Sequence, residues 1–495
     1  MEWITWLTVL LVLVVAVVLF VRMMSANHNT FKKMGIDTPP GANLFGHFAL
    51  GVEHGMFKCQ TEYYKMFKDH KVYGWYDIRT PVLIVKDLDM AKDIMVKHFK
   101  HFTDRRVPVE HDAPFKDNLL TLKGDKWKRI RSIITPTFSS GRLKKMAPHV
   151  ERNAKLLLEN LRRKQESGEE IELRDACSCF ALDVIASIGF GLDINTLGDP
   201  SNTFAKEARN CTNPNILLLV SLLFFPELRK VLRAVGLAVF PKKSMEYLAR
   251  AVDVAIEGRR RDGSAGKLND FLDLVMNAEQ EDGEGTREPL TRSELHSLSI
   301  MLIFGGLETI STVMSFTLFL LAVHPDCCLR AQKEIDDKIG KEAPSYDNVQ
   351  QLDYLEMCLS EAMRMAPPGF ILDRQCVEDV TIQGVHIPKG MPVLVPIYAI
   401  HNDPEIWPRP ETFDPERFTP ENKASRHPYA FLPFGQGPRN CIGMRLALVE
   451  LKIALSTVLQ KFTPVKCSKT VYPFNLSKTL LKANDGLWVK IEARK

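Results

Sequence analysis

One segment of the chain combines a cysteine with three glycines directly before a long helical pattern. It runs Phe434-Gly435-Gln436-Gly437-Pro438-Arg439-Asn440-Cys441-Ile442-Gly443. Glycines allow a backbone to lie close against a flat ligand. Cys441 would lie where the helix begins, and the unpaired amides and the helix dipole at that point stabilise a thiolate. A thiolate ligand supports O–O bond cleavage at an iron centre. A buried structural cysteine would not explain the residues found at these offsets around Cys441.

This segment resembles the haem-binding loop of the cytochrome P-450 family, whose pattern is FxxGxRxCxG. Every fixed position of that pattern is present. The resemblance extends over nearly the whole chain, and in the C-terminal half it is strongest to the microsomal drug- and steroid-oxidising group of animals and to thromboxane synthase. It implies a haem b cofactor with Cys441 as the proximal ligand of the iron. It also assigns further residues of the loop to cofactor binding: Phe434, Gly437, Arg439 and Gly443.

A second motif is Glu361-Ala362-Met363-Arg364, which lies in a predicted helix. Residues three apart share a helix face, so Glu361 and Arg364 can pair. Alone, such a pair would usually be a surface ion pair of little value. The motif resembles the family's ExxR pair, and Pro415-Glu416-Arg417-Phe418 resembles the loop that completes it. The resemblance therefore implies that Glu361, Arg364 and Arg417 form a structural network beneath the haem.

The third motif, Phe304-Gly305-Gly306-Leu307-Glu308-Thr309, interrupts a long apolar helix. Two glycines inside a helix cost ~1 kcal/mol each relative to alanine, so they need a reason. Close helix packing is one explanation. The other comes from the resemblance, which implies an oxygen-binding groove where the helix locally opens. In that groove Glu308 and Thr309 would organise water and protons for the cleavage of dioxygen.

Several cations resemble the residues that bind the two haem propionates in this family. Trp127 and Arg131 match its WxxxR helix, with the indole N–H of Trp127 as a further donor. Arginine suits carboxylates because its guanidinium fork is planar and always charged. The implied set of cations is Arg105, Arg131, Arg374 and Arg439, although Asp373 stands where the family more usually has Glu.

The substrate side is implied by position after the ExxR motif and along the glycine-containing helix. The residues expected to face the substrate are Phe304, Gly305, Gly369, Phe370, Ile371, Leu372 and Leu480. Their apolar character favours a lipophilic substrate, such as a steroid, a fatty acid or a xenobiotic. Ordinary core packing is the alternative for each of them.

The elements that must position these residues are mostly helical. Apolar residues follow helical spacing over 147–163, 177–188, 295–323, 329–339, 354–365 and 445–462. Few segments look like strands, namely 72–85 and 393–397. We therefore expect a mainly α fold with small β-sheets, the cytochrome P-450 fold in the light of the resemblance. The polar stretch 277–288 is expected to be a solvated loop.

The first segment, Trp3 to Val21, is almost continuously apolar and has the ~20 residues needed to cross a bilayer. A cleaved signal peptide would have basic residues before a shorter run, whereas Arg22, Lys32 and Lys33 follow this one. We expect an N-terminal transmembrane helix, 1–24, a linker with a Pro-rich hinge, 25–41, and a haem-thiolate catalytic domain, 42–495. The expected location is the endoplasmic reticulum membrane, single-pass, with the catalytic domain in the cytosol.

The stretch 215–241 is apolar but too short and too broken by proline to span a membrane. A buried pair of core helices is one interpretation. Basic residues flank the stretch, so a surface that dips into the lipid headgroup region is the other.

Composition excludes some partners and indicates others. The 65 Lys and Arg residues nearly balance the 60 Asp and Glu residues, which argues against a nucleic-acid binder. No GxGxxG follows a strand in a βαβ context and no P-loop occurs, so electrons must come from another protein. The resemblance implies an NADPH-dependent flavoprotein reductase, with cytochrome b5 as a further donor and membrane lipids as surroundings. A basic face for the donor would comprise Lys126, Lys128, Arg129, Arg445 and Lys452, although solvated surface charge is the simpler explanation.

We therefore expect a haem-dependent monooxygenase that inserts one oxygen atom of O₂ into a lipophilic substrate. One alternative is a haem-thiolate isomerase or dehydratase that acts on endoperoxides or hydroperoxides, against which Thr309 argues. Another is a membrane-bound haem carrier or sensor, which would have no need of Glu308 and Thr309 after the two glycines.

Overall fold

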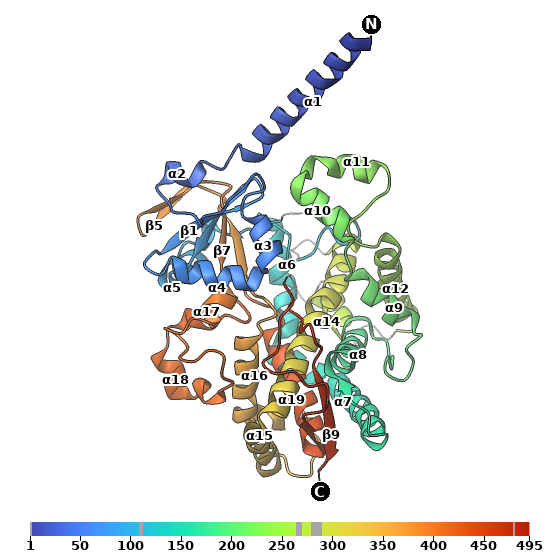
Figure 1. Cartoon of the computed structure of the whole chain (residues 1–495). Helices are drawn as coiled ribbons and strands as arrows, with labels where there is room; N and C mark the ends of the chain where they lie inside the picture. Colours follow the sequence, from blue (N-terminus) through green and yellow to red (C-terminus); the bar gives the residue numbers. More distant parts are fainter. Residues whose placement is uncertain (1, 108–111, 264–269, 279–289, 479–480, 495) are drawn as a thin grey trace.

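Helices dominate the computed structural model, which describes residues 2–107, 112–263, 270–278, 290–478 and 481–494 (Figure 1). The long helices of the body are α7 (Ser140–Glu166), α8 (Leu173–Ile185), α12 (Lys242–Arg261), α14 (Arg292–Val323), α15 (Pro325–Lys338), α16 (Asp353–Met365) and α19 (Met444–Lys461). Shorter helices are α2 (Thr30–Met34), α3 (Phe48–His54), α4 (Met56–Met66), α5 (Leu88–Lys92), α6 (Gly124–Ile134), α9 (Thr203–Cys211), α10 (Ile216–Phe224), α11 (Arg229–Ala234), α13 (Phe271–Ala278), α17 (Ile397–His401) and α18 (Pro420–Ser425). The expected mainly α fold is confirmed.

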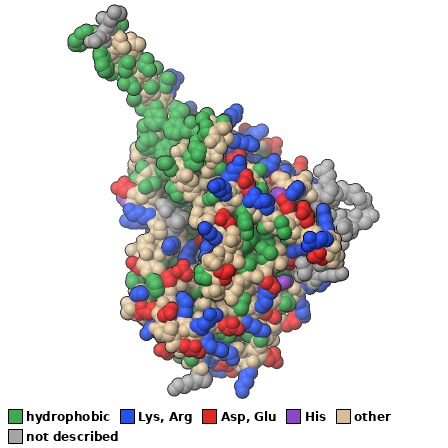
Figure 2. Space-filling model, turned by 90° about the vertical axis from the view of Figure 1, so that its right-hand side faces the viewer, with side chains coloured by type: hydrophobic (Ala, Val, Ile, Leu, Met, Phe, Trp, Pro, Cys, Tyr) green, Lys and Arg blue, Asp and Glu red, His purple; other side chains and the backbone are tan. Residues whose placement is uncertain are grey.

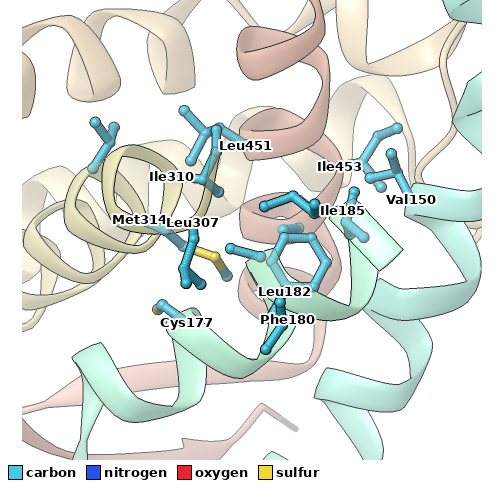
Figure 3. Packing of buried hydrophobic residues seen from close by; sticks show 14 of the residues in the cluster. Val150, Cys177, Phe180, Leu182, Ile185, Leu307, Ile310, Met314, Leu451 and Ile453 are labelled. Atoms are coloured by element: carbon cyan, nitrogen blue, oxygen red, sulfur yellow. The ribbon is translucent and has the colours of Figure 1, made fainter. Parts of the chain in front are cut away.

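Helix α14 runs through the centre of the helical core. It begins with a capping box, in which the Glu294 N–H donates to Thr291 Oγ1 at 3.3 Å and the Thr291 N–H donates to Glu294 Oε2 at 2.9 Å. The helix is apolar nearly all round, which is typical of a buried helix. Figure 3 shows its side chains packed between those of α8 and α19, with Leu307 and Ile310 among them.

One sheet has the strand order β1-β2-β7-β4, from β1 (Val72–Asp77), β2 (Thr80–Val85), β7 (Pro392–Val395) and β4 (Leu372–Gln375). Strands β1 and β2 are antiparallel, β2 and β7 are parallel, and β7 and β4 are antiparallel. The sheet therefore brings the N-terminal part of the body against residues 372–395. The strand predicted over 393–397 ends at Val395, because Pro396 lacks a backbone donor and α17 begins after it.

Smaller sheets complete the fold. β3 (Ile171–Glu172), β9 (Trp488–Ala493) and β8 (Phe462–Val465) pair in that order, and β5 (Val380–Ile382) pairs with β6 (Val385–Ile387). Two large hydrophobic clusters lie between these elements. The helical cluster contains buried apolar residues of α7, α8, α14, α16 and α19. The sheet cluster contains those on one face of β1 and β2 and those of β7, while Tyr73, Val82 and Ile84 on the other face form a small cluster with Phe67.

Helix α1 (Glu2–Ser25) projects from one end of the body, and its apolar side chains are exposed (Figure 1). It is long and apolar enough to cross a membrane, whereas α14, which also passes that test, is mostly buried. The last turn of α1 and the chain after it pack on the body. Met24, in that last turn, and Phe31 of α2 are fully buried, and a side chain at Gly74 would collide with the ring of Phe31. The segment 25–41, expected as a linker, is thus partly anchored to β1, while its boundaries stay predictions.

The stretch 215–241 forms α10, a single 3-10 turn and α11 at the end of the body from which α1 projects (Figure 1). Its side chains include many exposed apolar ones, such as Leu217 at 77% and Val235 at 65%. The interpretation as a buried helix pair is therefore wrong, because only a minority of these residues face inward. Figure 2 shows hydrophobic side chains gathered where α1 meets the body. Of the loop expected over 277–288, residues 277 and 278 end α13 and the rest lies outside the described residues.

Candidate functional site

The loop that carries Cys441 is folded back on itself just before α19. The Cys441 N–H donates to the carbonyl oxygen of Phe434 at 2.8 Å, and the Asn440 N–H donates to that of Gly437 at 3.0 Å. Gly437 has a φ of +77°, and a Cβ at this position would collide with the carbonyl oxygen of Met95. Only glycine satisfies both constraints. The helix α19 then begins after Gly443.

The environment of Cys441 combines exposure with desolvation. Its side chain is solvent-accessible, yet the protein atoms around it desolvate the thiol and raise its pKa. The two observations agree if the thiol faces a recess lined by protein. A backbone hydrogen bond from Gly443 and the charges of Arg131 and Arg105 oppose the increase in pKa. A metal ion bound by the sulfur would deprotonate it outright.

The predicted cations gather around this loop. Arg131 Nη2 donates to Asn440 Oδ1 at 3.0 Å, and Arg105 Nη2 donates to the carbonyl oxygen of Arg439 at 3.4 Å. The guanidinium of Arg439 lies 4.2 Å from the ring centroid of Trp127. It donates to the carbonyl oxygens of Leu122, at 2.6 Å, and Thr103. The N–H groups of Arg439 therefore donate largely to backbone carbonyl oxygens. These hydrogen bonds and the contact with Trp127 hold the loop against α6.

Arg374 is the cation with unused donors. It is fully buried in β4, and Nη1 donates to the carbonyl oxygen of Asp373 at 2.7 Å, while Nε and Nη2 have no hydrogen-bond partner among the described residues. Burial lowers the pKa of Arg374 to about 10 and that of Arg439 to about 9, and the nearby charge of Arg105 contributes to both. Buried donors of a cation without an acceptor are costly.

This arrangement fits the group that the resemblance implies. The accessible thiol suits a planar ligand with a metal at its centre. Carboxylates at the edge of that ligand would accept from the unused N–H donors of Arg374 and would offset the repulsion between the neighbouring guanidinium groups. Asp373 is the nearby acid, with Oδ1 3.9 Å from Arg105 Nη1, and it also accepts the Arg106 N–H at 2.8 Å. Arg106, which forms an ion pair with Asp77, was not anticipated from the sequence.

The ExxR network is assembled as expected. Arg364 donates twice to Glu361, from Nε to Oε2 at 2.7 Å and from Nη2 to Oε1 at 2.8 Å. Arg417 Nε lies 3.3 Å from the same carboxylate as an ion pair without ideal hydrogen-bond alignment. All three side chains are buried, and desolvation raises the pKa of Glu361. Arg364 Nη1 also donates to the carbonyl oxygen of His401 at 2.8 Å, which ties α16 to α17.

On α14 the two glycines have different surroundings. A Cβ at Gly306 would lie 2.9 Å from Ile185 Cδ1, so this glycine permits the close approach of α8. A Cβ at Gly305 would meet nothing within 4 Å among the described residues. The hydroxyl of Thr309 donates to the carbonyl oxygen of Gly305 at 2.6 Å. The helix is continuous from Arg292 to Val323, so the local opening expected from the resemblance is absent from this described stretch.

Glu308 points in another direction from its neighbour. Its carboxylate forms an ion pair with Arg174 of α8, and it lines a polar cavity of about 380 Å³ together with Arg209 and Lys482. Arg174 was missed from the sequence, because nothing in the local pattern around it distinguishes it from a surface cation.

The predicted substrate residues are only partly brought together. Phe304 stacks on Phe115, with ring centroids 4.6 Å apart. Gly369 is exposed, and Ile371 is half-buried. Phe370 packs edge-on against Phe57 of α4 with centroids 5.1 Å apart. Leu372 is buried beside Gly435 of the cysteine loop. Leu480 lies outside the described residues.

The basic face expected for the electron donor has fewer available cations than the sequence predicted. Lys452 is 4% exposed and its Nζ lies 2.6 Å from Glu356 Oε2, so its inclusion was wrong. Lys126 pairs with Asp117 at 2.6 Å and Arg129 with Glu294. Lys128 and Arg445 are both exposed, and Lys128 pairs with the exposed Asp125 at 2.9 Å, an ion pair open to solvent.

Comparison with known proteins adds independent information. The sequence model of the cytochrome P-450 family matches residues 37–490. The chain is 39% identical over 472 residues to cytochrome P-450 3A7 of Homo sapiens, covering 94% of this chain and 93% of the relative. It is 38% identical over 484 residues to cytochrome P-450 3A11 of Mus musculus, covering 96% and 95%. It is also 38% identical over 479 residues to cytochrome P-450 3A12 of Canis lupus familiaris, covering 94% and 93%.

Proposed function

This chain belongs to the cytochrome P-450 family, and we propose that it oxidises a lipophilic substrate with electrons from an NADPH-dependent flavoprotein reductase. As a member of the family it is a monooxygenase with haem b and a cysteine thiolate ligand. The observation that carries the proposal is the accessible thiol of Cys441 beside the unused donors of Arg374.

The residues of this chain would have distinct roles around the haem. Cys441 Sγ would hold the iron, and Arg374, Arg131 and Arg105 would hold the propionates, with Arg439 and Trp127 fixing the loop. When bound, a haem with a thiolate ligand supplies the cleavage of the O–O bond. Thr309 would hold a proton at Oγ1, since its hydroxyl is already oriented by the Gly305 carbonyl oxygen. Proton delivery by a positioned group contributes typically 10²- to 10⁴-fold.

A lipophilic substrate is supported by the apolar residues near α14 and by the position of the body relative to α1. The exposed apolar residues of α10 and α11 and the helix α1 lie at one end of the molecule (Figures 1 and 2). We propose that this end contacts lipid, with α1 in the endoplasmic reticulum membrane and the catalytic domain in the cytosol. A substrate dissolved in the bilayer would then meet the body at this end.

A separate protein as electron donor is supported by the sequence, which has neither a GxGxxG in a βαβ context nor a P-loop with which to bind a nucleotide cofactor of its own. We propose that the donor docks near Lys128 and Arg445, and that cytochrome b5 can use the same face. Both cations are exposed and flank the part of the body that carries Trp127 and Cys441.

Reconstitution tests the proposal. The full chain, loaded with haem in lipid nanodiscs, is mixed with the reductase, NADPH and a panel of lipophilic compounds under isotope-labelled dioxygen. The expected product carries one labelled oxygen atom per NADPH consumed. Conversion of a hydroperoxide or endoperoxide without NADPH, and with no incorporation from dioxygen, would instead identify an isomerase or dehydratase.

A further inference from the structure

The polar cavity of about 380 Å³ beside Glu308 lies between α8, α9, α14 and the C-terminal loop. Three cations line it, each from a different element: Arg174 of α8, Arg209 of α9 and Lys482 of the loop. The acids in the described lining are Asp175 and Glu308, so three cations against two acids leave one positive charge in excess. Seen from α1, the helices α8 and α9 lie beyond α10 and α11 (Figure 1). An occupant of this cavity would therefore come from the aqueous phase.

Two of the three cations are not engaged with an acid. Arg209 and Lys482 form no ion pair within the part of the chain that the structure describes, and Lys482 is exposed. Arg209 Nη2 donates instead to Cys179 Sγ at 2.9 Å, and a sulfur is a weak acceptor. The charge of Arg209 also acts on the buried Asp183, whose carboxylate already accepts the Thr196 N–H at 3.0 Å. Both cations thus have donors to offer an anion in the cavity.

The third cation, Arg174, holds Glu308 in an exchangeable ion pair. The two side chains are 21% and 54% exposed, and an exposed pair of this kind contributes little to stability. The guanidinium itself is fixed by other contacts, because Nη1 lies 3.3 Å from Thr312 Oγ1 and 3.4 Å from the carbonyl oxygen of Leu481. An anion that reaches Arg174 would therefore displace the Glu308 carboxylate without moving the guanidinium.

The other walls indicate the kind of anion. Ser178, Thr212 and Asn213 add hydroxyl and amide groups, and Leu307 is the apolar side chain of the described lining. A lipophilic ligand would gain little from such walls. Guanidinium forks match carboxylates, and cations on three elements suit a ligand with more than one carboxylate. The volume lies at the lower end of the range of ligand pockets, about 300–1,000 Å³, so the ligand would be small.

We propose that this cavity binds small organic dicarboxylates. One carboxylate is held by Arg209 and Lys482, and the other competes with Glu308 for Arg174. Because binding is reciprocal, an occupied cavity releases Glu308, and removal of the Glu308 charge strengthens binding. The consequence for proton delivery rests on the proposed function, but the binding equilibrium does not.

The test uses the full-length, haem-loaded chain in phosphatidylcholine nanodiscs at constant ionic strength, with succinate as the probe. Cys179 lines the cavity, so succinate should slow its alkylation by iodoacetamide, which mass spectrometry of the peptide measures. Cys467 does not line the cavity, and its alkylation should not change. Titration calorimetry of the same samples measures the affinity without the thiol. Succinamate, in which an amide replaces one carboxylate, should bind roughly fivefold or more weakly, because it lacks one of the ion pairs.

Charge variants assign the site. Arg209→Gln/Lys482→Gln should weaken the affinity for succinate roughly fivefold or more, since two ion pairs are lost. Lys482→Glu should weaken it more than Lys482→Gln. The control, Lys206→Gln/Lys490→Gln, removes two exposed cations that do not line the cavity and should match the unmodified chain. Equal losses in the two double variants would overturn the assignment, because general attraction to the surface would then explain binding.

Glu308→Gln tests the competition, because it should strengthen the binding of succinate by up to about fivefold. Asp175→Asn, which removes an acid that forms no ion pair among the described residues, should strengthen it less. Equal effects of the two variants, or no effect of Glu308→Gln, would contradict the competition for Arg174.

The thiolate signature of the reduced, carbon monoxide-bound haem separates this inference from the proposed function. If that signature is present while Arg209→Gln/Lys482→Gln leaves the affinity for succinate unchanged, the dicarboxylate site fails alone. If the signature is missing in the unmodified chain while the charge variants behave as expected, the proposed function fails and the dicarboxylate site stands.

Discussion

Arg174 of α8 and Glu308 of α14 form an ion pair across the interface of the two helices. Arg174 Nη1 also lies 3.3 Å from Thr312 Oγ1 and 3.4 Å from the carbonyl oxygen of Leu481. The guanidinium thus joins α8, α14 and the C-terminal loop, and it sets the direction of the Glu308 carboxylate. Arg174 is in this sense a positioning residue for a group that we expect to relay protons.

Arg174→Gln should lower the ratio of product formed to NADPH consumed, because Glu308 loses the partner that holds it. We expect a decrease of roughly fivefold or less, since the ion pair is partly exposed. Arg174→Lys should restore most of the ratio, and the pH profile of coupling should shift in the Gln variant alone. Lys482→Gln removes a cation from the same cavity and serves as the control. An unchanged ratio and pH profile would reduce Arg174 to a structural contact.

Thr309→Ala should uncouple NADPH consumption from substrate oxidation. Iron reduction should be little affected, but the hydroxyl that lies 2.6 Å from the Gly305 carbonyl oxygen is lost. Peroxide should then replace oxidised substrate, with a loss of about 10²- to 10⁴-fold in the proton-dependent step. Product, NADPH and peroxide are measured in parallel. The same ratio in variant and unmodified chain would mean that Thr309 only packs, and an isomerase would become more plausible.

Cys441→His should abolish the long-wavelength Soret band of the thiolate-ligated, carbon monoxide-bound haem, even where haem is retained. The Phe434 carbonyl oxygen and the Gly437 turn do not involve the sulfur, so the loop should keep its fold. Optical spectra of the reduced protein provide the measurement. Persistence of the band would remove Cys441 as the ligand. A Cys467→Ser variant, altered at a half-buried thiol outside this loop, should keep the band.

Glu450 should make stability fall with rising pH. It is buried in α19, its Oε1 has no hydrogen-bond partner among the described residues, and desolvation raises its pKa to about 8. Because the folded pKa exceeds the ordinary value of 4.5, the contribution of the protonated form is fully present below pH 4.5 and is lost as pH rises through 8.

Glu450→Gln should remove that slope and stabilise the fold above pH 8 by on the order of 2–4 kcal/mol. Unfolding midpoints in denaturant between pH 6 and about 9 provide the measurement. The exposed Glu421 of α18, changed to Gln, is the control and should keep the slope of the unmodified chain. A Gln variant with that same slope would contradict the assignment to Glu450.

Removal of α1 should abolish integral membrane attachment but leave peripheral association through α10 and α11. A chain that starts at Arg22 keeps the buried Met24 and Phe31, whereas one that starts at Lys32 loses both. The shorter chain should therefore be less stable by about 3–5 kcal/mol, the usual cost of deleting a buried phenylalanine. Flotation with vesicles and thermal unfolding measure the two effects. If the chain starting at Arg22 were wholly soluble at low salt, the second membrane contact would be disproved.

Local motifs could be predicted from the sequence because both partners are neighbours in the chain. Glu361 and Arg364 are three apart, and the cysteine loop contains its own glycines. Arg174 could not be predicted, because it is 134 residues from Glu308 and only the packing of α8 on α14 joins them. The helices were predictable from apolar spacing, but spacing does not reveal which apolar face is covered.

Because the sequence does not show which surfaces are covered, the predictions for 215–241 and for Lys452 were wrong. The stretch 215–241 has the composition of a core, yet its outer face is uncovered, since Leu217 and Val231 on that face are 77% and 59% exposed. Lys452 was expected at the surface because it is charged, whereas its pairing with Glu356 allows it to be buried. Gly305 and Gly306 are the same residue type at adjacent positions, so the sequence cannot distinguish their roles. Only their neighbours in space show that Gly306 permits close helix packing, whereas the Cβ position of Gly305 is open.

The loop that carries Cys441 joins the two hydrophobic clusters, since Leu432 belongs to the sheet cluster and Ile442 packs on the helical cluster. We expect the two clusters to open as two cooperative units, so that amide hydrogen exchange would give the backbone amides of each cluster their own protection factors. A ligand held by this loop must be released before either unit opens fully. Its binding energy is then shared by both units, so that amides of β7 and of α19 should slow together as ligand occupancy rises.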